Sequence, residues 1–203
     1  MYITQDAAFI HMPRTGGSFI KQTLHDLGIK NQPSPYKAHI GIKLINSKFP
    51  DRKLWTSVRN PIHHLRSFWA CRWSIFMTPI NGQGGFDHFY GSDCSFIEFI
   101  ETYLENYSGT LSKWYRKKLT LDNRYPALDY FVKTEDLPNG LIPVLKNLEY
   151  PITKEQKRKI KASKKVNAYY KKGGSLPKSL KHEIIKAEQD LITTFGYLPN
   201  ELL

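Results

Sequence analysis

A short segment near the amino end of the chain combines the residue types that bind a phosphate group. Residues 13–18 read Pro-Arg-Thr-Gly-Gly-Ser and follow an apolar run at 7–10 after two intervening residues. The glycines can adopt positive φ, the hydroxyl and main-chain N–H groups can donate hydrogen bonds, and the arginine supplies a cation. Apolar residues at helical spacing from Phe19 to Leu27, with a stop at Gly28, predict a helix that begins at this turn. The segment is therefore predicted to bind an anion at the start of a helix.

The same segment differs from the loop of the common nucleotide kinases. A Walker-type loop requires a glycine, four residues and then Gly-Lys-Ser or Gly-Lys-Thr, whereas here two adjacent glycines precede Ser18. This difference weakens the kinase interpretation. Asp129, next to an apolar run, could still provide a magnesium-binding carboxylate, so a kinase remains an alternative. A turn with no ligand is the remaining alternative for this segment.

A second segment repeats the order of strand, loop and helix. Residues 54–58 form a β-rich apolar run, Arg59-Asn60-Pro61 follow, and a helical pattern begins at Ile62. Ser67 lies eight residues after Arg59, inside the predicted helix. A chain that folds back at Pro61 could bring both side chains to one phosphate group.

Together, the two segments resemble the phosphate-binding motifs of the sulfotransferases that use 3′-phosphoadenosine 5′-phosphosulfate (PAPS), in particular the carbohydrate-type sulfotransferases. The resemblance implies that Arg59 and Ser67, after the Val-Arg-Asn-Pro pattern at 58–61, bind the 3′-phosphate. It also implies contacts with the 5′-phosphosulfate from the first segment, namely Pro13, Arg14, Thr15, Gly16, Gly17, Ser18 and Phe19.

Three further segments resemble other sequence motifs of the same family. His39-Ile40-Gly41 resembles the approach to the second strand, where a histidine is the catalytic base, and Thr134 matches a residue that contacts adenine. A basic, glycine-containing segment resembles the loop that closes over the 3′-phosphate, although the arginine that precedes it in the family is replaced here. Its implied contacts are Lys171, Lys172 and Gly173.

The family resemblance implies a sulfotransferase that moves a sulfonate group from PAPS to a hydroxyl acceptor, with release of 3′,5′-adenosine bisphosphate (PAP) and without a metal. A carbohydrate is the favoured acceptor, and a small metabolite is the alternative. Most relatives carry lysine where this chain has Arg14, and the permanent charge of arginine limits it to electrostatic stabilisation. His39 is the preferred base because an imidazole titrates near neutral pH. His63 and His64 compete for that role, whereas His11 is interpreted as a support for the loop.

Length and charge agree with this interpretation. We expect residues 1–203 to form one α/β domain of the P-loop-like sulfotransferase type, with three layers and a central parallel sheet flanked by helices. The net charge of +12 suits an anionic cofactor. A non-enzymatic module that binds RNA or another polyanion would explain the charge but not two ordered phosphate motifs, so no nucleic acid is expected. The basic run at 154–172 is interpreted as a solvated helix face.

The remaining signals concern location and helix boundaries. The sequence shows neither a stretch of membrane-spanning length nor a signal peptide, so we expect a cytoplasmic protein whose two cysteines, Cys71 and Cys94, are free thiols. The glycine-rich segment 79–91 is either a loop over the active site or a surface excursion. Predicted helix boundaries are two capping boxes, Ser95 with Glu98 and Thr153 with Gln156, and a last helix from Pro177 to Phe195 that stops at Gly196.

Overall fold

A computed structural model describes residues 1–32, 40–71, 94–163 and 174–202. The chain divides into two compact units, one made of residues 1–59 and 113–167 and the other of residues 60–112 and 168–203. Each unit consists of two separate stretches of the chain. One domain over residues 1–203 stays a prediction. No helix in the described part of the chain is both long and apolar enough to cross a membrane.

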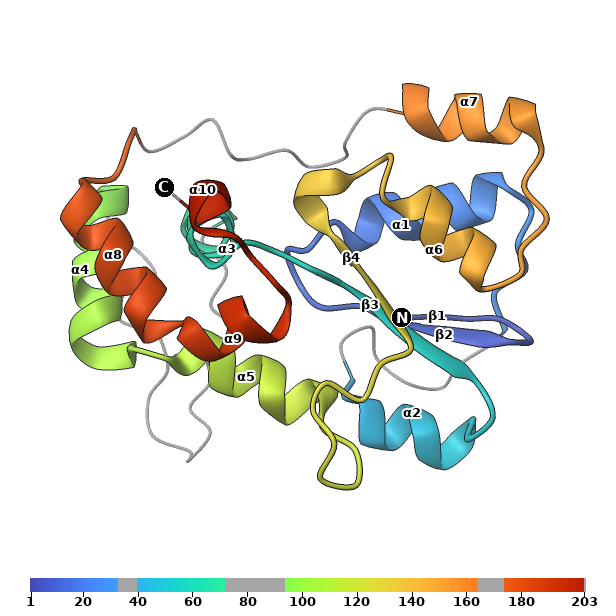
Figure 1. The fold of residues 1–203 in the computed structure, drawn as a ribbon, viewed down its shortest axis with the longest axis horizontal. Coiled ribbons are helices and arrows are strands. Elements are labelled where there is room, and N and C mark those ends of the chain that lie inside the picture. The colour runs from blue at the N-terminus through green and yellow to red at the C-terminus, as the bar shows by residue number, and fades with distance from the viewer. Residues whose placement is uncertain (33–39, 72–93, 164–173, 203) are drawn as a thin grey trace. The chain divides into compact units, whose positions relative to one another are not determined.

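The first unit contains a four-stranded sheet in the order β1 (Tyr2–Ile3), β2 (Ala7–Ile10), β3 (Lys53–Val58) and β4 (Tyr130–Lys133) (Figure 1). Strands β2, β3 and β4 are parallel, as predicted for an α/β fold. Strand β1 pairs antiparallel with β2 at the edge, so the sheet is mostly rather than entirely parallel. Strand β1 is not predictable from the sequence, because two residues are too few to show an alternating pattern.

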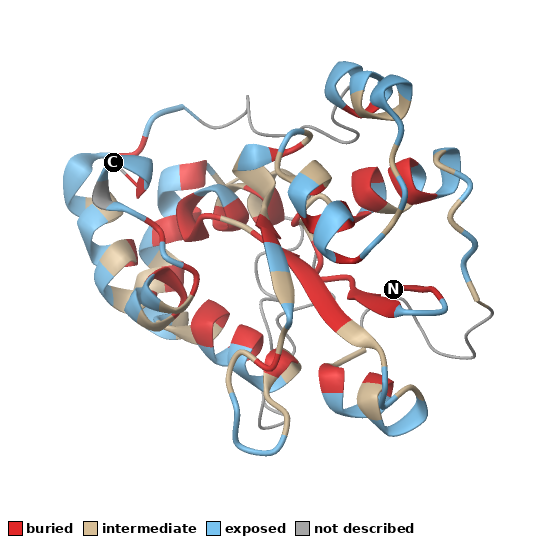
Figure 2. Ribbon diagram, turned by 45° about the vertical axis from the view of Figure 1, so that its right-hand side comes forward, coloured by how far each residue is buried: buried red, intermediate tan, exposed pale blue. Residues whose placement is uncertain are grey.

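The central strands are apolar because helices cover both faces of the sheet. Figure 2 shows β2 and β3 buried along most of their length. Helices α1 (Gly17–Asp26) and α6 (Leu141–Asn147) lie over one face, and α2 (Ile42–Lys48) lies over the other (Figure 1). The fold class is therefore confirmed as a central, mostly parallel sheet flanked by helices.

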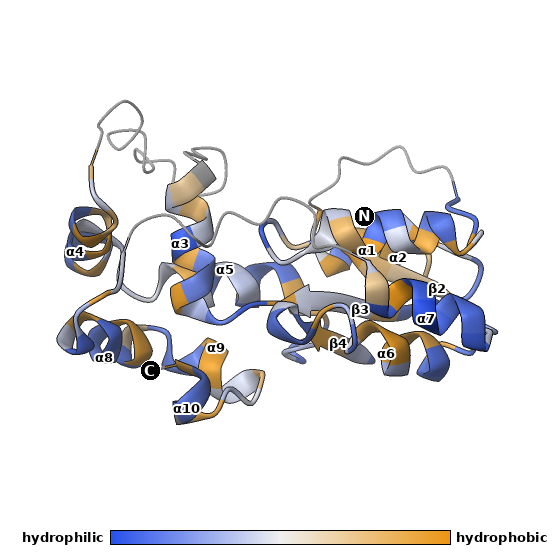
Figure 3. Cartoon of the chain, turned by 90° about the horizontal axis from the view of Figure 1, so that it is seen from above, coloured by the Kyte–Doolittle hydropathy of each residue, from blue (hydrophilic) through white to orange (hydrophobic). Residues whose placement is uncertain are grey.

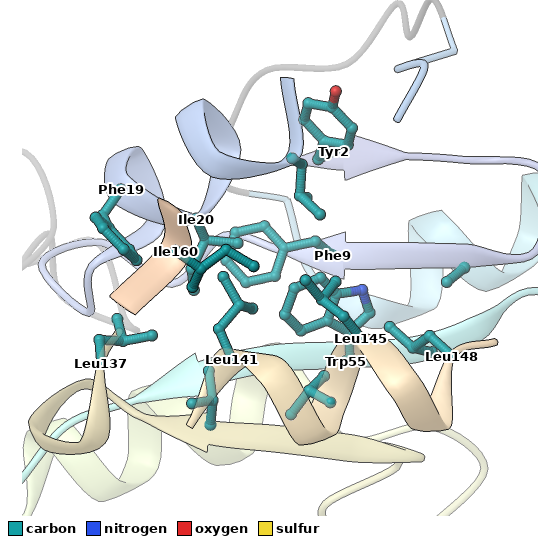
Figure 4. Packing of buried hydrophobic residues seen from close by; sticks show 14 residues of the cluster. Tyr2, Phe9, Phe19, Ile20, Trp55, Leu137, Leu141, Leu145, Leu148 and Ile160 are labelled. Carbon is teal, nitrogen blue, oxygen red and sulfur yellow. The ribbon is translucent and has the colours of Figure 1, made fainter. Parts of the chain in front are cut away.

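One hydrophobic cluster joins the sheet to α1, α6 and α7 (Lys154–Ala162) (Figure 4). The rings of Phe9 on β2 and Trp55 on β3 lie 4.6 Å apart, between their centroids, and form its centre. Helix α1 adds Phe19 and Ile20, whereas Ile160 is the one buried residue of α7. The cluster thereby fixes the start of α1 on the sheet, which is where the predicted phosphate loop ends.

The second unit is helical. It contains α3 (Pro61–Cys71), α4 (Phe96–Tyr107), α8 (Lys178–Ala187), α9 (Gln189–Thr194) and α10 (Pro199–Leu202), and α5 (Thr110–Leu119) begins in it and continues in the first unit. Helices α3, α4 and α8 contact one another. Both predicted capping boxes are confirmed, at the starts of α4 and α7, and Cys94 is a free thiol as predicted.

The prediction of one helix from Pro177 to Phe195 is wrong, because α8 and α9 are separated at Glu188. This residue leaves helical geometry, with φ −106° and ψ 24°, and its carboxylate is fully buried. The carboxylate accepts hydrogen bonds from the N–H and the hydroxyl of Ser112, at 2.7 and 2.5 Å, and from the hydroxyl of Tyr103. The predicted stop at Gly196 is confirmed by its positive φ of 61°.

The buried Glu188 carboxyl group should make stability depend on pH. Burial raises its pKa above the usual value of 4.5, against the opposing effect of its hydrogen bonds from Ser112 and Tyr103. A carboxyl group with a raised folded-state pKa stabilises the fold below its unfolded pKa, and that contribution is lost as the pH rises through the folded pKa. The melting temperature of the wild type should therefore fall relative to that of Glu188→Gln as the pH increases above about 4.5. Circular dichroism melts of both proteins measure this difference, and a difference that does not change with pH would contradict the prediction.

Candidate phosphate-binding site

The predicted phosphate-binding loop lies at the carboxyl ends of the parallel strands. In the strand pairing, Ile10 is opposite Thr56, and Val58 is opposite Lys133, so β2, β3 and β4 finish close to the same edge. The segments that follow them begin at His11, Arg59 and Thr134. Ligands of open α/β sheets bind at this edge.

The loop has a conformation that only certain residues tolerate. Arg14 and Gly16 both adopt left-handed backbone angles, with φ of 63° and 82°, and α1 begins at Gly17. A Cβ atom on Gly16 would lie 2.8 Å from Cδ1 of Leu137, and one on Gly17 would lie 1.9 Å from Cδ2 of His11. The second glycine is therefore required because the His11 ring packs directly against the helix start.

Buried hydroxyl groups hold the loop on the sheet. The Thr15 hydroxyl, which is completely buried, donates to the carbonyl oxygen of Met12 at 2.7 Å and lies 2.8 Å from the hydroxyl oxygen of Ser57. The Thr134 hydroxyl lies 2.8 Å from the carbonyl oxygens of both Thr15 and Val58, so its single proton is shared between them. Loop, β3 and the end of β4 are thus linked by three hydroxyl groups.

These contacts change the roles that can be assigned to two predicted cofactor residues. The Thr15 side chain points into the protein, and both the hydroxyl and the methyl of Thr134 face the loop, the methyl lying 3.5 Å from the position of a Cβ on Gly16. Both side chains therefore position the loop. A ligand could contact Thr15 and Thr134 through their main-chain atoms.

The start of α1 offers hydrogen-bond donors to an anion. No side chain caps this helix. The N–H of Ile20 donates to the carbonyl oxygen of Gly16 at 3.1 Å, and the N–H groups of residues 17–19 have no acceptor within the helix. Ser18 is exposed in this first turn, and Arg14 is half-buried beside it in the loop. Phe19 is buried in the hydrophobic cluster, so its side chain is excluded from ligand contact. The loop and the first turn of α1 therefore carry main-chain N–H groups, one hydroxyl and one cation that could bind a phosphate group.

Arg59 supports the loop in the structure. Its Nη1 donates to the carbonyl oxygen of Arg14 at 3.0 Å. Its main-chain N–H forms a hydrogen bond with the phenol oxygen of Tyr115 on α5, and burial raises the pKa of Tyr115 well above 10, so this group stays a neutral phenol. Ser67 lies nearly completely buried on α3, in the second unit. The joint binding of one phosphate group by Arg59 and Ser67 stays a prediction.

The three histidines considered as the catalytic base differ in what the structure shows of them. The preferred base, His39, lies outside the described residues, as do Lys171, Lys172, Gly173 and the glycine-rich segment 79–91. On α3, His63 is exposed, whereas His64 is fully buried and stacks on the ring of Phe68 at 4.7 Å between centroids. Of these two competitors, His63 is the one whose ring an acceptor can reach.

His11 supports the loop, in agreement with the interpretation from the sequence. Its side chain is nearly buried, its ring lies 6.0 Å from that of Phe9, and its edge packs against Gly17. Neither Ser57, which contacts the loop, nor Tyr115, which contacts Arg59, is among the site residues predicted from the sequence. Ser57 could have been found as a hydroxyl group inside an otherwise apolar strand end, but Tyr115 carried no such signal.

Asp129 lies at the opposite end of the sheet from the loop. Its carboxylate accepts a hydrogen bond from the N–H of Leu54 at 2.6 Å, and its own N–H donates to the carbonyl oxygen of Leu54 at 2.8 Å. Leu54 belongs to the first residues of β3, so these contacts hold Asp129 where the parallel strands begin. Within the described ranges, no group of three or more His, Cys, Asp and Glu side chains could hold a metal ion.

The comparisons with known proteins agree with this geometry at the level of fold. No protein-family model matches the sequence, and no curated protein matches it either. The fold is similar to that of mouse sulfotransferase SULT7A1, whose crystal structure is a complex with PAP. The TM-score is 0.50 and the identity 12%, and the match covers 98% of this chain and 88% of that chain. The chain therefore has the α/β fold of a sulfotransferase.

Proposed function

We propose that this protein is a PAPS-dependent sulfotransferase that moves a sulfonate group to a hydroxyl acceptor, with a carbohydrate as the favoured acceptor. The observation that carries the proposal is the loop at residues 13–18, which opens α1 with uncapped N–H groups on a sulfotransferase fold. The position of Asp129 at the far end of the sheet removes the residue that favoured a magnesium-dependent kinase. We also propose one functional domain over residues 1–203 and a cytoplasmic location.

When bound, PAPS supplies the sulfonate group and the phosphate that leaves with PAP. The N–H groups at the start of α1 and the Ser18 hydroxyl stabilise negative charge that develops on the phosphosulfate. Arg14 adds a permanent cation and donates no proton. His39 accepts the proton of the acceptor hydroxyl as its oxygen attacks the sulfur atom.

The rest of the nucleotide is assigned to the other cofactor residues that the sequence predicts. Arg59 and Ser67 are proposed to bind the 3′-phosphate, with Lys171, Lys172 and Gly173 closing over it. Thr134 is proposed to contact adenine through its main chain, because its hydroxyl group is engaged with Thr15 and Val58. This allocation uses two phosphate sites and no metal.

Calorimetric titration tests the proposal directly. PAP should bind with a clear preference over ATP, and its affinity should be the same with magnesium or with a chelator, because the proposed site neutralises both phosphates with protein groups. Adenosine is the control, since it lacks both phosphates and should bind weakly. Equal affinities for PAP and ATP, or a strict requirement for magnesium, would overturn the assignment.

A further inference from the structure

Helix α7 carries four cations on one face. Lys154, Lys157, Arg158 and Lys161 stand at positions i, i+3, i+4 and i+7, which places them within about 100° around the helix axis. We call these four residues the cationic stripe. All of them except Lys157, which is half-buried, are exposed. The run is the predicted solvated helix face, and the structure shows that four of its charges lie along one face of α7.

The stripe is not compensated by nearby carboxylates. The one acidic residue of α7, Glu155, pairs with Lys159 at 2.9 Å, and both lie to the side of the stripe. Among the residues that the structure describes, no carboxylate forms an ion pair with any of the four stripe cations. Like charges three and four residues apart destabilise a helix. The stripe therefore carries repulsion that a bound polyanion would relieve.

Helix α7 has one buried side chain, which is apolar. Ile160, 2% exposed, projects into the hydrophobic cluster with Ile20 and Leu141 (Figure 4). The rest of the helix is hydrophilic along most of its length (Figure 3). The centre of the cationic stripe thus lies about a third of a turn around the helix axis from Ile160.

The composition of α7 selects among polyanions. Membrane-surface helices insert an exposed apolar face, but the apolar residue of α7 is already buried. Single-stranded nucleic acids stack their bases on aromatic side chains, and α7 has none. Protein partners rely on buried apolar or aromatic anchors, which the stripe also lacks. A linear polysaccharide with regularly repeated anionic groups requires only a row of cations. The phosphates of a nucleic-acid duplex could also bind such a row, and duplex DNA is therefore a competitor in the test.

From these observations we infer that the cationic stripe binds a sulfated or carboxylated polysaccharide. The inference goes beyond the proposed function and does not depend on it, because the binding involves neither nucleotide nor transfer chemistry. Binding of this kind is driven by the release of counterions and weakens as salt increases. With four contacts, raising the salt concentration fourfold should weaken binding by roughly fifty- to a hundred-and-fifty-fold, if each contact behaves as it does with nucleic acids.

Fluorescence anisotropy with a labelled heparin fragment, in the absence of nucleotide, tests the inference. Changing all four stripe residues to Gln should weaken binding at least thirtyfold at low salt and flatten the salt dependence. The control variant changes Lys43, Lys48, Lys113 and Lys117 to Gln, which removes the same charge from exposed positions of α2 and α5 in the same unit. This control should lose less than fivefold. A single pair on α7 itself, Lys157→Gln against Lys159→Gln, should show the larger loss for Lys157→Gln, by about two- to fivefold.

Three results would overturn the inference. One is an equal loss in the stripe variant and the charge-matched control, which would assign binding to net charge. The others are failure of the wild type to prefer heparin over uncharged dextran, and tighter binding of duplex DNA, of poly(U) RNA or of anionic lipid vesicles than of heparin. Circular dichroism melts confirm that each variant is folded. Failure of the PAP titration would leave all of these outcomes unaffected, so the two proposals fail separately.

Discussion

Gly17→Ala should reduce the affinity for PAP by roughly a hundred- to ten-thousand-fold. The new methyl group would lie 1.9 Å from Cδ2 and 2.1 Å from Nε2 of His11, so either the His11 ring or the first turn of α1 must move. A displacement of that turn misaligns main-chain donors, and loss of two charge-assisted hydrogen bonds at about 1.5 to 3 kcal/mol each accounts for the expected range. Calorimetry with PAP measures the loss.

Two controls separate this effect from general destabilisation. Gly28→Ala lies just beyond the other end of α1, where φ is 73° and a Cβ would meet nothing within 4 Å. It should cost about 1 kcal/mol of stability through the backbone alone and leave PAP affinity nearly unchanged. Adding His11→Ala to Gly17→Ala makes room for the methyl group and should restore part of the affinity. Wild-type PAP binding by folded Gly17→Ala would show that the loop is not the phosphate site.

The contrast between Gly17 and its neighbours shows what the sequence could predict about the site. The strand at β2, the loop and the start of α1 follow from local signals, namely an apolar run, a proline, two glycines and helical spacing. The contact between Gly17 and His11 depends on the path of the turn between them. The hydrogen bond between Thr15 and Ser57 depends on the pairing of β2 with β3, which joins residues 42 positions apart. Residue types therefore predicted an anion site, but not which side chains hold it together.

The errors in the fold have the same origin. Glu188 is compatible with a continuous helix by its own propensity, and the break arises from its contacts with Ser112 and Tyr103, 76 and 85 residues away. Helices α2 and α6 each have seven residues, which is shorter than the length at which periodicity identifies a helix. The capped helices α4 and α7 were predicted correctly, because their start signals are local.

His39→Ala should lower turnover by about a hundred- to ten-thousand-fold and leave the affinity for PAP nearly intact. A general base acts on the acceptor hydroxyl, so its loss affects proton transfer and not the binding of the nucleotide. Measurement requires an acceptor, which a screen of glycans and phenols with radiolabelled PAPS would first identify. PAP affinity of the same variant is then measured by calorimetry.

The choice of controls follows from the positions of the other charged groups. His63→Ala removes an exposed imidazole from α3 and should leave turnover within about twofold of the wild type, because the proposed base is His39. Arg14→Ala should differ in kind, since it removes a cation from the loop and should reduce both PAP affinity and turnover. Wild-type turnover by His39→Ala would place the base elsewhere. His63 would then be tested before His64, because His64 is fully buried against Phe68 and an acceptor would have to displace that packing to reach its ring.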